Sequence, residues 1–388
     1  MNSGPRVCVL SIGDEILNGR IYDTNAAFLG AELLKLSLVV QHHRCTSDQP
    51  QQLVKQLSEL SAQFDLIISS GGLGPTADDR VADEIKQFEL KTTSIANPAG
   101  TADGIAVEFE SGCKYFALPG PPVECQQSFQ QSLLPILTDV FADVAQTAYH
   151  TMHFIGTHEA HLASFIPELF LQDANPTLGI TASEQGVTIS MLARQTTTHS
   201  ADYFIEQCRK QVKSKLGQWF WGEGDISLAS EVVRVATEQQ LTFALAESCT
   251  GGQVAAALVD IPGASKVLNC CWVTYANDSK RRQLDVSGDL LDEHGAVSEQ
   301  VAEAMARGAL SKSQADFAVS ITGVAGPTGG TEDKPVGTVC FAIAAADGVH
   351  SLTCQQYSLG GRQRIQRQSV RDALYLFLQA MRGQIVLR

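Results

Sequence analysis

The sequence predicts an α/β protein of three domains, in which two large α/β domains flank a small α+β unit. Apolar runs of strand length alternate with helical patterns over residues 1–148 and again over 226–388, as expected for parallel sheets with helical crossovers. Residues 149–225 depart from this alternation. A chain of 388 residues is also too long for one ordinary core, so several domains are expected.

The first domain begins with an apolar run at 6–12 that predicts a strand. The next helix has Asp23 or Thr24 as its N-cap, with apolar residues on one face. Further elements are expected as a strand at 37–43, a helix at 51–60, a strand at 65–70, a strand ending in LPGPP and a helix near 122–142.

The other two domains are predicted in the same way. In the middle unit we expect strands at 152–157 and 186–192, helices at 158–171 and 201–216, and a linker at 221–225. In the last domain we expect helices at 228–239, 251–259, 298–312 and 363–382, and strands at 241–246, 268–275, 316–321 and 336–345.

Composition limits the class of protein. The formal net charge of −14 argues against nucleic acid as the main partner, and no apolar run reaches the length of a membrane span. The ten cysteines are scattered and form no C-x-x-C pair, so we expect buried free thiols in a reducing compartment rather than disulfides or zinc ligands. With no signal-peptide pattern at the start, the expected location is cytoplasmic.

Three loops of the first domain follow predicted strands, namely GDE (13–15), GGLGPTADD (71–79) and LPGPPVE (118–124). If these strands are parallel, the loops are expected to meet at one edge of the sheet. The loop GGLGPTADD contributes Gly71, Gly72 and Gly74, and its backbone N–H groups suit an anion. Acidic side chains accompany it, namely Asp14, Glu15, Asp78 and Asp79. Asp78 and Asp79 either cap a helix or hold a divalent metal, and a capped turn without a ligand remains the alternative.

The stretch AESCTGG places Ser248, Cys249 and Thr250 where a strand gives way to a helix. Ser248 is either a simple N-cap or a nucleophile beside backbone N–H groups of the helix start, which Gly251 and Gly252 leave open to a substrate. Cys249 lacks a nearby histidine that would activate it, and Thr250 is weaker still.

A base for Ser248 is available without histidine. WVTYANDSKRR places Tyr275 at a strand end and Lys280 five residues later, and a Ser–Lys dyad is an established alternative to a triad. Burial and the neighbouring cations Arg281 and Arg282 would help this lysine to lose its proton. The alternative is that these basic residues form a solvated helix start.

Further polar residues follow in the last domain. Thr322 ends a strand before a Gly/Pro loop that contains Gly326, Gly329 and Gly330, and Arg362 follows another glycine pair. Ordered loops of this kind usually hold a ligand or a neighbouring segment, and an arginine there suits a phosphate, so we assign the phosphate to Arg362 and the loop on the basis of charge. The alternative is that Arg362 is a surface arginine that opens the last helix.

Three histidines stand close together in the middle unit, at positions 153, 158 and 161. They lie near a strand–helix junction, with no cysteine and no clear fourth ligand. We therefore interpret them as surface or capping residues.

The motifs AESCTGG, VTYANDSK, HGAVSE, ITGVAGPTGGTEDKPVGTV and LGGR closely resemble the C-terminal domain of the CinA family, the nicotinamide mononucleotide (NMN) amidohydrolases. The resemblance implies hydrolysis of the carboxamide of NMN to nicotinate mononucleotide and ammonia, without a metal or other cofactor. It implies Ser248 as nucleophile, Tyr275 and Lys280 as its activating pair, and Thr322 and Arg362 as further polar site residues.

The first domain, through GDEILNGR, GGLGPTADD and LPGPPVE, resembles the CinA N-terminal domain, a three-layer α/β fold similar to molybdopterin-binding proteins. The middle unit resembles the KH-like insert of CinA proteins. The N-terminal resemblance implies a metal-dependent ADP-ribose pyrophosphatase with Asp79 as a metal candidate. Only seventeen residues separate Asp79 from Asn97, fewer than the family pattern has, which counts against that activity.

Three functions therefore remain open from the sequence. The leading one is the NMN amidohydrolase, followed by the pyrophosphatase and by a non-catalytic nucleotide-binding protein. The expected partners are small nucleotides, NMN and possibly ADP-ribose, and a second copy of the chain in a homodimer, with no nucleic acid and no membrane.

Overall fold

The N-terminal domain is built on a six-stranded sheet of order β2-β1-β3-β6-β5-β4, in a computed structural model that describes residues 4–75, 79–171, 173–357 and 360–383. The first four strands of this order pair in parallel, and β5 pairs antiparallel with both of its neighbours, β6 and β4. The strands are β1 (Val7–Ile12), β2 (Val40–Thr46), β3 (Leu66–Ser70), β4 (Thr93–Ile95), β5 (Gly104–Glu108) and β6 (Lys114–Leu118). The helices are α1 (Asp14–Leu17), α2 (Thr24–Lys35), α3 (Pro50–Ser61), α4 (Val81–Lys86), α5 (Pro122–Ser128) and α6 (Leu134–Val140), with a π-helical turn at Phe129–Leu133.

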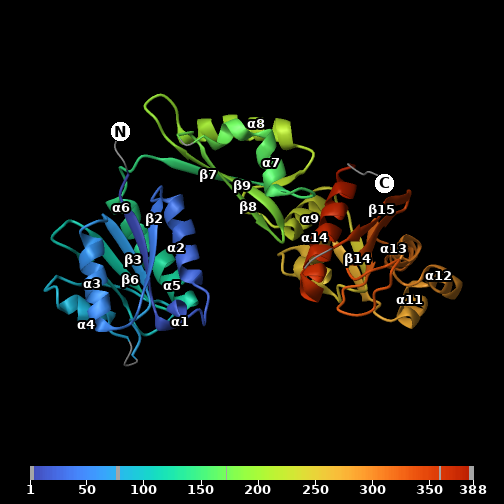
Figure 1. Cartoon of the computed structure of the whole chain (residues 1–388), viewed down its shortest axis with the longest axis horizontal. Helices are drawn as coiled ribbons and strands as arrows, with labels where there is room; N and C mark the ends of the chain where they lie inside the picture. Colours follow the sequence, from blue (N-terminus) through green and yellow to red (C-terminus); the bar gives the residue numbers. More distant parts are fainter. Residues whose placement is uncertain (1–3, 76–78, 172, 358–359, 384–388) are drawn as a thin grey trace. The chain divides into compact units, whose positions relative to one another are not determined.

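Two apolar cores lie on opposite faces of this sheet, because successive side chains of a strand alternate between its faces. Leu10 and Ile67 pack with Leu57 of α3 in one core, whereas Val9 and Ile68 pack with α2 and the α5–α6 segment in the other. Figure 1 shows α3 and α4 on one side of the sheet and α2 and α5 on the other. The domain is therefore the expected three-layer α/β fold.

Two local predictions for this domain need correction. The strand expected at 37–43 runs from Val40 to Thr46, because Ser37 adopts a left-handed turn and Leu38 returns to the core. Asp79 does not take the N-cap position of α4, since Arg80 occupies it with no side-chain cap hydrogen bond, and Asp78 lies outside the described residues. By contrast, Asp23 caps α2 as predicted, accepting a hydrogen bond from the N–H of Ala26 at 2.9 Å.

The middle unit has a four-stranded sheet of order β10-β7-β9-β8. Its elements are β7 (Thr147–Phe154), α7 (Glu159–Phe165), β8 (Thr177–Ser183), β9 (Gly186–Arg194), α8 (Ala201–Leu216) and β10 (Phe220–Glu223). The helix expected over 158–171 ends at Phe165, and Pro167 begins a short 3-10 turn instead. The expected linker at 221–225 is largely the edge strand β10, which pairs antiparallel with β7.

The C-terminal domain has a five-stranded sheet of order β12-β11-β13-β14-β15. Strands β12, β11 and β13 pair in parallel, and β14 pairs antiparallel with both β13 and β15. Its strands are β11 (Phe243–Glu247), β12 (Leu268–Val273), β13 (Phe317–Gly323), β14 (Thr338–Ala345) and β15 (Gly348–Gln356). Its helices are α9 (Leu228–Glu238), α10 (Gln253–Val259), α11 (Asn277–Leu284), α12 (Gly288–His294), α13 (Glu299–Ser313) and α14 (Gly361–Met381), with a 3-10 turn at Ala264–Lys266.

The alternation of β11 shows how this sheet is covered. Phe243 and Leu245 belong to a core shared with α9, α10 and α14, whereas Ala244 and Ala246 pack with α13 on the other face. The nucleophile candidate follows directly at the end of this strand, in the centre of the parallel part of the sheet. The carboxyl end of β11 therefore lies between the helices on the two faces of the sheet, and the turn that carries Ser248 begins there.

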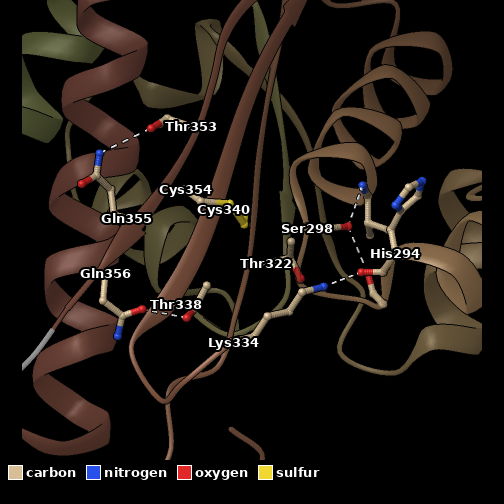
Figure 2. Close-up of a disulfide and its surroundings, with 12 residues drawn as sticks. His294, Ser298, Thr322, Lys334, Thr338, Cys340, Thr353, Cys354, Gln355 and Gln356 are labelled. Atoms are coloured by element: carbon tan, nitrogen blue, oxygen red, sulfur yellow. Dashed lines mark hydrogen bonds between the residues drawn. A yellow bond between two sulfur atoms is a disulfide. The ribbon is translucent and has the colours of Figure 1, made fainter. Parts of the chain in front are cut away.

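The cysteine prediction was wrong at one pair. Cys340 and Cys354 form a disulfide between β14 and β15, where their backbones lie opposite each other in register (Figure 2). The other eight cysteines are free thiols, as expected, but only five of them are buried: Cys45 and Cys270 are half-buried and Cys271 is exposed. Sequence spacing did not show the pair, because the strand that carries Cys354 was not predicted.

The described residues include no helix long and apolar enough to cross a membrane.

Candidate active site

The nucleophile candidate sits in a tight turn between β11 and α10. Ser248 is 7% exposed, and its backbone N–H donates to the carbonyl of Ile321 on the adjacent strand β13. Gly251 and Gly252 both adopt positive φ, and α10 begins only at Gln253, so the predicted start at residue 251 was two residues early. Two consecutive left-handed residues allow this turn, and glycine adopts that conformation without strain.

Lys280 lies directly against the serine. Its Nζ is 3.0 Å from Ser248 Oγ and donates at 2.8 Å to the carbonyl of Thr274, although 31 residues separate the serine from the lysine along the chain. The lysine is in the first half of α11, which packs on α13 through Leu284. The side chain is only 1% exposed. The amine is therefore held between the serine and one carbonyl, away from water.

Burial lowers the pKa of Lys280 from 10.5 to about 8. The expected contribution of adjacent cations is not the cause, because Arg281 and Arg282 are exposed and Arg282 pairs with Asp278. At pH 7 roughly one such lysine in ten is neutral, against roughly one in three thousand for an ordinary lysine. A neutral amine beside a hydroxyl is a general base, which is the role that a Ser–Lys dyad requires.

Cys249 has the opposite character. Burial raises the pKa of its thiol to about 12, so the reactive thiolate is scarce at neutral pH. Its carbonyl accepts a hydrogen bond at 2.8 Å from Gln366 Nε2 on α14, which links the turn to that helix. The geometry favours the serine over the cysteine as the nucleophile.

Sequence reasoning missed the role of Glu247, the last residue of β11. Its carboxylate is fully buried and accepts hydrogen bonds from the N–H groups of Gly252, Val254 and Ala255 at 2.9, 3.2 and 2.9 Å. An acidic residue at the end of an apolar strand that runs into a helix is the signal that was available, because helix N-termini attract carboxylates.

This arrangement corrects the expectation that the helix start holds an oxyanion. The N–H groups of Gly251 and Gln253 donate to backbone carbonyls, and those of Gly252, Val254 and Ala255 donate to Glu247. Within the described chain, no acceptor is found for the N–H groups of Cys249 and Thr250. The two donors left over are those of the residues that follow the serine.

Tyr275 and Arg362 meet at a more exposed part of the site. Arg362 Nη2 donates to Tyr275 Oη at 2.8 Å, and Nη1 donates to the carbonyl of Gly326 at 2.9 Å. Tyr275 is 60% exposed. The arginine therefore joins the strand end before α11 to the glycine loop, and Gly329 and Gly330 lie further along that loop. Lys280 donates to Ser248 Oγ and to the carbonyl of Thr274, whereas Tyr275 Oη accepts a hydrogen bond from Arg362.

Thr322 is the second-to-last residue of β13, since the strand continues to Gly323, and it is buried, with its Oγ1 donating at 2.7 Å to the carbonyl of Ala296. Figure 2 shows Thr322 beside Lys334, whose Nζ donates to the carbonyl of His294. Cys340 of the disulfide is the register partner of Thr322 on β14. Thr322 is thus fixed by the segment that leads into α13, on the face of the sheet that carries the disulfide.

The three predicted N-terminal loops do meet at one sheet edge. A Cβ on Gly71 would lie 2.2 Å from the carbonyl oxygen of Ile12, and a Cβ on Gly120 would lie 3.4 Å from Gly71 Cα. Only glycine at position 71 permits this close approach between the loop after β3 and the end of β1. Gly72 packs against Val81, and Gly74 against the Asp79 carboxylate.

The acidic candidates at this edge are dispersed. The N–H of Asp14 donates to the Asp48 carboxylate at 3.1 Å, the Glu15 carboxylate folds back over Gly13, and Asp79 lies beside Gly74. Asp78 lies outside the described residues. Among the described residues, no three His, Cys, Asp or Glu side chains gather as a metal site would require. The described donor set therefore does not fit a divalent metal.

A polar network occupies the same edge. The Asp23 carboxylate accepts from the Ser11 hydroxyl and lies 3.0 Å from His43 Nε2. Sequence reasoning assigned Asp23 only as a cap. The network joins β1, β2 and the start of α2.

The histidines of the middle unit are structural or capping residues. His158 caps α7 by accepting from the N–H of His161, and His161 Nδ1 lies 2.9 Å from Thr157 Oγ1. His153 bonds through its two ring nitrogens to Thr188 and to the carbonyl of Gly224.

Comparison with known families accounts for the three domains in order. Residues 8–139 match a model of a probable molybdopterin binding domain, 149–222 match the damage-inducible protein CinA KH domain, and 225–381 match the CinA C-terminal domain.

Full-length relatives align over most of the chain. The sequence is 32% identical over 403 residues to a CinA-like protein of Dictyoglomus thermophilum, covering 94% of this chain and 97% of the relative. It is 34% identical over 371 residues to a CinA-like protein of Dictyoglomus turgidum, covering 86% and 90%. Among solved structures, the competence/damage inducible protein CihA from Agrobacterium tumefaciens is 43% identical, covers 39% of this chain and 93% of its own, and has a TM-score of 0.38.

Proposed function

The chain belongs to the CinA family, and we propose that its C-terminal domain is an amidohydrolase that converts NMN to nicotinate mononucleotide and ammonia. The observation that carries this proposal is the buried contact of 3.0 Å between Lys280 Nζ and Ser248 Oγ, with a lysine pKa of about 8. Such a pair supplies a nucleophile and its base for acyl transfer from an amide.

In the acylation step, neutral Lys280 takes the proton of Ser248 as Oγ attacks the carboxamide carbon. The developing oxyanion is stabilised by backbone N–H donors of the turn. The Lys280 ammonium then gives its proton to the departing nitrogen, and ammonia leaves when the C–N bond breaks. The acid of this step is thus the base of the previous one, and the lysine returns to its neutral state.

In the deacylation step, Lys280 takes a proton from water, whose oxygen attacks the ester carbon of the acyl-enzyme. Collapse of the tetrahedral intermediate breaks the bond between that carbon and Ser248 Oγ, which recovers its proton from Lys280. The carboxylate product is nicotinate mononucleotide. Every proton transfer uses residues of this chain, so we propose that the deamidase works without a metal or other cofactor.

The exposed rim supplies binding of the nucleotide. Arg362 uses two of its donors to hold Tyr275 and Gly326, and a guanidinium has five. The remaining donors suit a phosphate, and Gly329 and Gly330 keep the loop beside it free of side chains. Thr322 completes the polar set, with a hydroxyl lone pair left to accept from the substrate amide.

The test measures ammonia and nicotinate mononucleotide formed from NMN by the full chain in excess chelator. Ser248→Ala is expected to lower turnover by at least about 1000-fold, as in other enzymes that lose their nucleophile. Ser369→Ala is the matched control, because Ser369 is another buried serine of this domain, and its hydroxyl donates to the carbonyl of Ile365 on α14.

Turnover that persists in Ser248→Ala would exclude the serine as nucleophile. A folded wild-type protein that releases no ammonia would exclude NMN as the substrate.

A further inference from the structure

Glu247 is a buried carboxylate whose partners, within the described chain, are backbone N–H groups alone. Alternation along β11 turns it to the face covered by α10, where Phe243 and Leu245 enter the core. Both of its oxygens are engaged, Oε2 by Gly252 and Val254 and Oε1 by Ala255. Charged acceptors bind N–H donors about twice as strongly as neutral ones, so the turn is held firmly.

These bonds decide which donors remain beside the nucleophile. A helix start ordinarily exposes several unpaired N–H groups. Here the carboxylate takes three of them, and two carbonyls take those of Gly251 and Gln253. The N–H groups of Cys249 and Thr250 are the pair without an acceptor in the described chain, and they belong to the residues directly after Ser248.

We propose that Glu247 is a positioning residue that selects the oxyanion donors: by occupying the helix-start N–H groups it leaves Cys249 N–H and Thr250 N–H to hold the oxyanion. The proposal rests on the proposed amidohydrolase function and deepens it. Glu247 touches neither substrate nor the reacting atoms, and it acts through the shape of the turn that joins β11 to α10.

Glutamine cannot replace this carboxylate. An amide has one acceptor oxygen, and its NH2 group would face an N–H that Glu247 now accepts. Aspartate keeps both acceptor oxygens but on a shorter stem, so it reaches fewer of the three donors. We therefore expect a graded effect, with Glu247→Asp between the wild type and Glu247→Gln.

The experiment follows Ser248 itself, using a fluorophosphonate probe on the full chain. In this reaction Ser248 Oγ forms a bond to phosphorus, the P–F bond breaks, fluoride leaves and Lys280 takes the hydroxyl proton. The rate is measured by mass spectrometry of the peptide that contains Ser248, and folding of each variant by its thermal unfolding. NMN turnover is measured in parallel for kcat and KM.

Misplacing an oxyanion donor typically costs about 100-fold or more in rate. Glu247→Gln is expected to slow labelling by about 100-fold and to lower kcat with little change in KM. Glu231→Gln is the matched control: Glu231 is a buried glutamate of the same domain, bonded to Arg234 and Arg382, and its loss is expected to lower stability while labelling stays within about twofold.

The outcomes separate the two ideas. A wild type that labels at Ser248 but leaves NMN unchanged defeats the proposed substrate, while the labelling rates still judge Glu247. Wild-type labelling rates in folded Glu247→Gln overturn the positioning role; if that variant does not fold, the same result in Glu247→Asp overturns it. A wild type that is not labelled at Ser248 also overturns it, because no activated serine is then present to be positioned.

Discussion

Both α/β domains place glycine-rich loops after the carboxyl ends of parallel strands, but they treat their polar side chains differently. At the C-terminal edge, Lys280 is 1% exposed and its amine contacts one serine hydroxyl and one carbonyl. At the N-terminal edge, the His43 side chain that contacts Asp23 and Ser11 is 46% exposed. Water therefore screens the second group and is excluded from the first.

The comparison shows how burial changes the properties of a basic side chain. Burial without a carboxylate partner lowers the pKa of Lys280, whereas the N-terminal histidine lies beside a carboxylate in partial contact with solvent. The two edges share loop geometry and glycine content. Exclusion of water distinguishes them, and the predictions below test whether that difference separates a catalytic edge from a structural one.

The largest effect is expected from Lys280→Met, which removes the base and keeps much of the apolar stem. Turnover of NMN should fall by about 1000-fold or more, as for loss of a dyad member. Lys312→Met is the matched control, because Lys312 pairs with Asp285 away from the serine. Ammonia release by folded Lys280→Met at the wild-type rate would contradict the assignment of the base.

The pH dependence of kcat/KM should follow the neutral form of Lys280. Burial lowers its pKa to about 8, so activity should rise about tenfold per pH unit below that value and level off above it. The rise from pH 6 to pH 8 is therefore about 50-fold, because half of the lysine is neutral at its pKa. A profile that keeps rising towards pH 10 would show that the lysine titrates as an exposed amine does.

Arg362→Ala tests the rim against the buried pair. If the guanidinium binds the phosphate, KM for NMN should rise about 10- to 100-fold, the value of one or two charged hydrogen bonds. KM for nicotinamide riboside, which lacks the phosphate, should be unaffected. Arg367→Ala on the same helix, whose partner is Glu184, provides the control. Equal losses for both substrates would point to a role in shaping the loop instead.

Asp23→Ala tests whether the N-terminal network is structural. It removes the cap of α2 and the acceptor of the Ser11 hydroxyl, so the N-terminal domain should lose about 1–2 kcal/mol of unfolding free energy. Denaturant unfolding measures this change, and NMN turnover should stay at the wild-type level. A fall in deamidation without a loss of stability would show that the two domains are coupled.

The smallest effect is expected at the N-terminal edge in an assay of ADP-ribose cleavage with Mg²⁺. Because the described acidic residues do not gather into a three-ligand group, we expect no metal-dependent release of products. Cleavage that depends on the metal and disappears in Asp79→Ala would make this edge catalytic too.

Pattern predicted the central strands better than the edges. The runs at 6–12, 65–70 and 241–246 each have an apolar centre of strand type (VCVL, LII and FALA), and they became β1, β3 and β11. Strand β15 was missed because an edge strand buries little, and its sequence GVHSLTCQQ has no clear alternation. The disulfide was missed with it, since only strand pairing places Cys354 opposite Cys340.

The candidate site divides in the same way. The motifs identified Ser248, Lys280, Tyr275, Thr322 and Arg362 as candidates, but they did not show which of these side chains contact one another. Tyr275 was expected to assist the lysine, which stays a prediction, and the structure adds that its hydroxyl accepts a hydrogen bond from Arg362. Glu247 ends an apolar strand that runs into a helix, and this pattern was available in the sequence, but the three N–H groups that it binds are known only from the folded turn.

What the sequence by itself determined is the alternation of strands and helices, the glycines that permit the turn after Ser248, and the residues available for chemistry. These are local properties, set by side-chain period and backbone freedom. What only the tertiary structure decided is the pKa of Lys280 and the use of each N–H group near the serine. Both depend on which groups are removed from water and which acceptors packing brings within reach, and distant segments supply those neighbours.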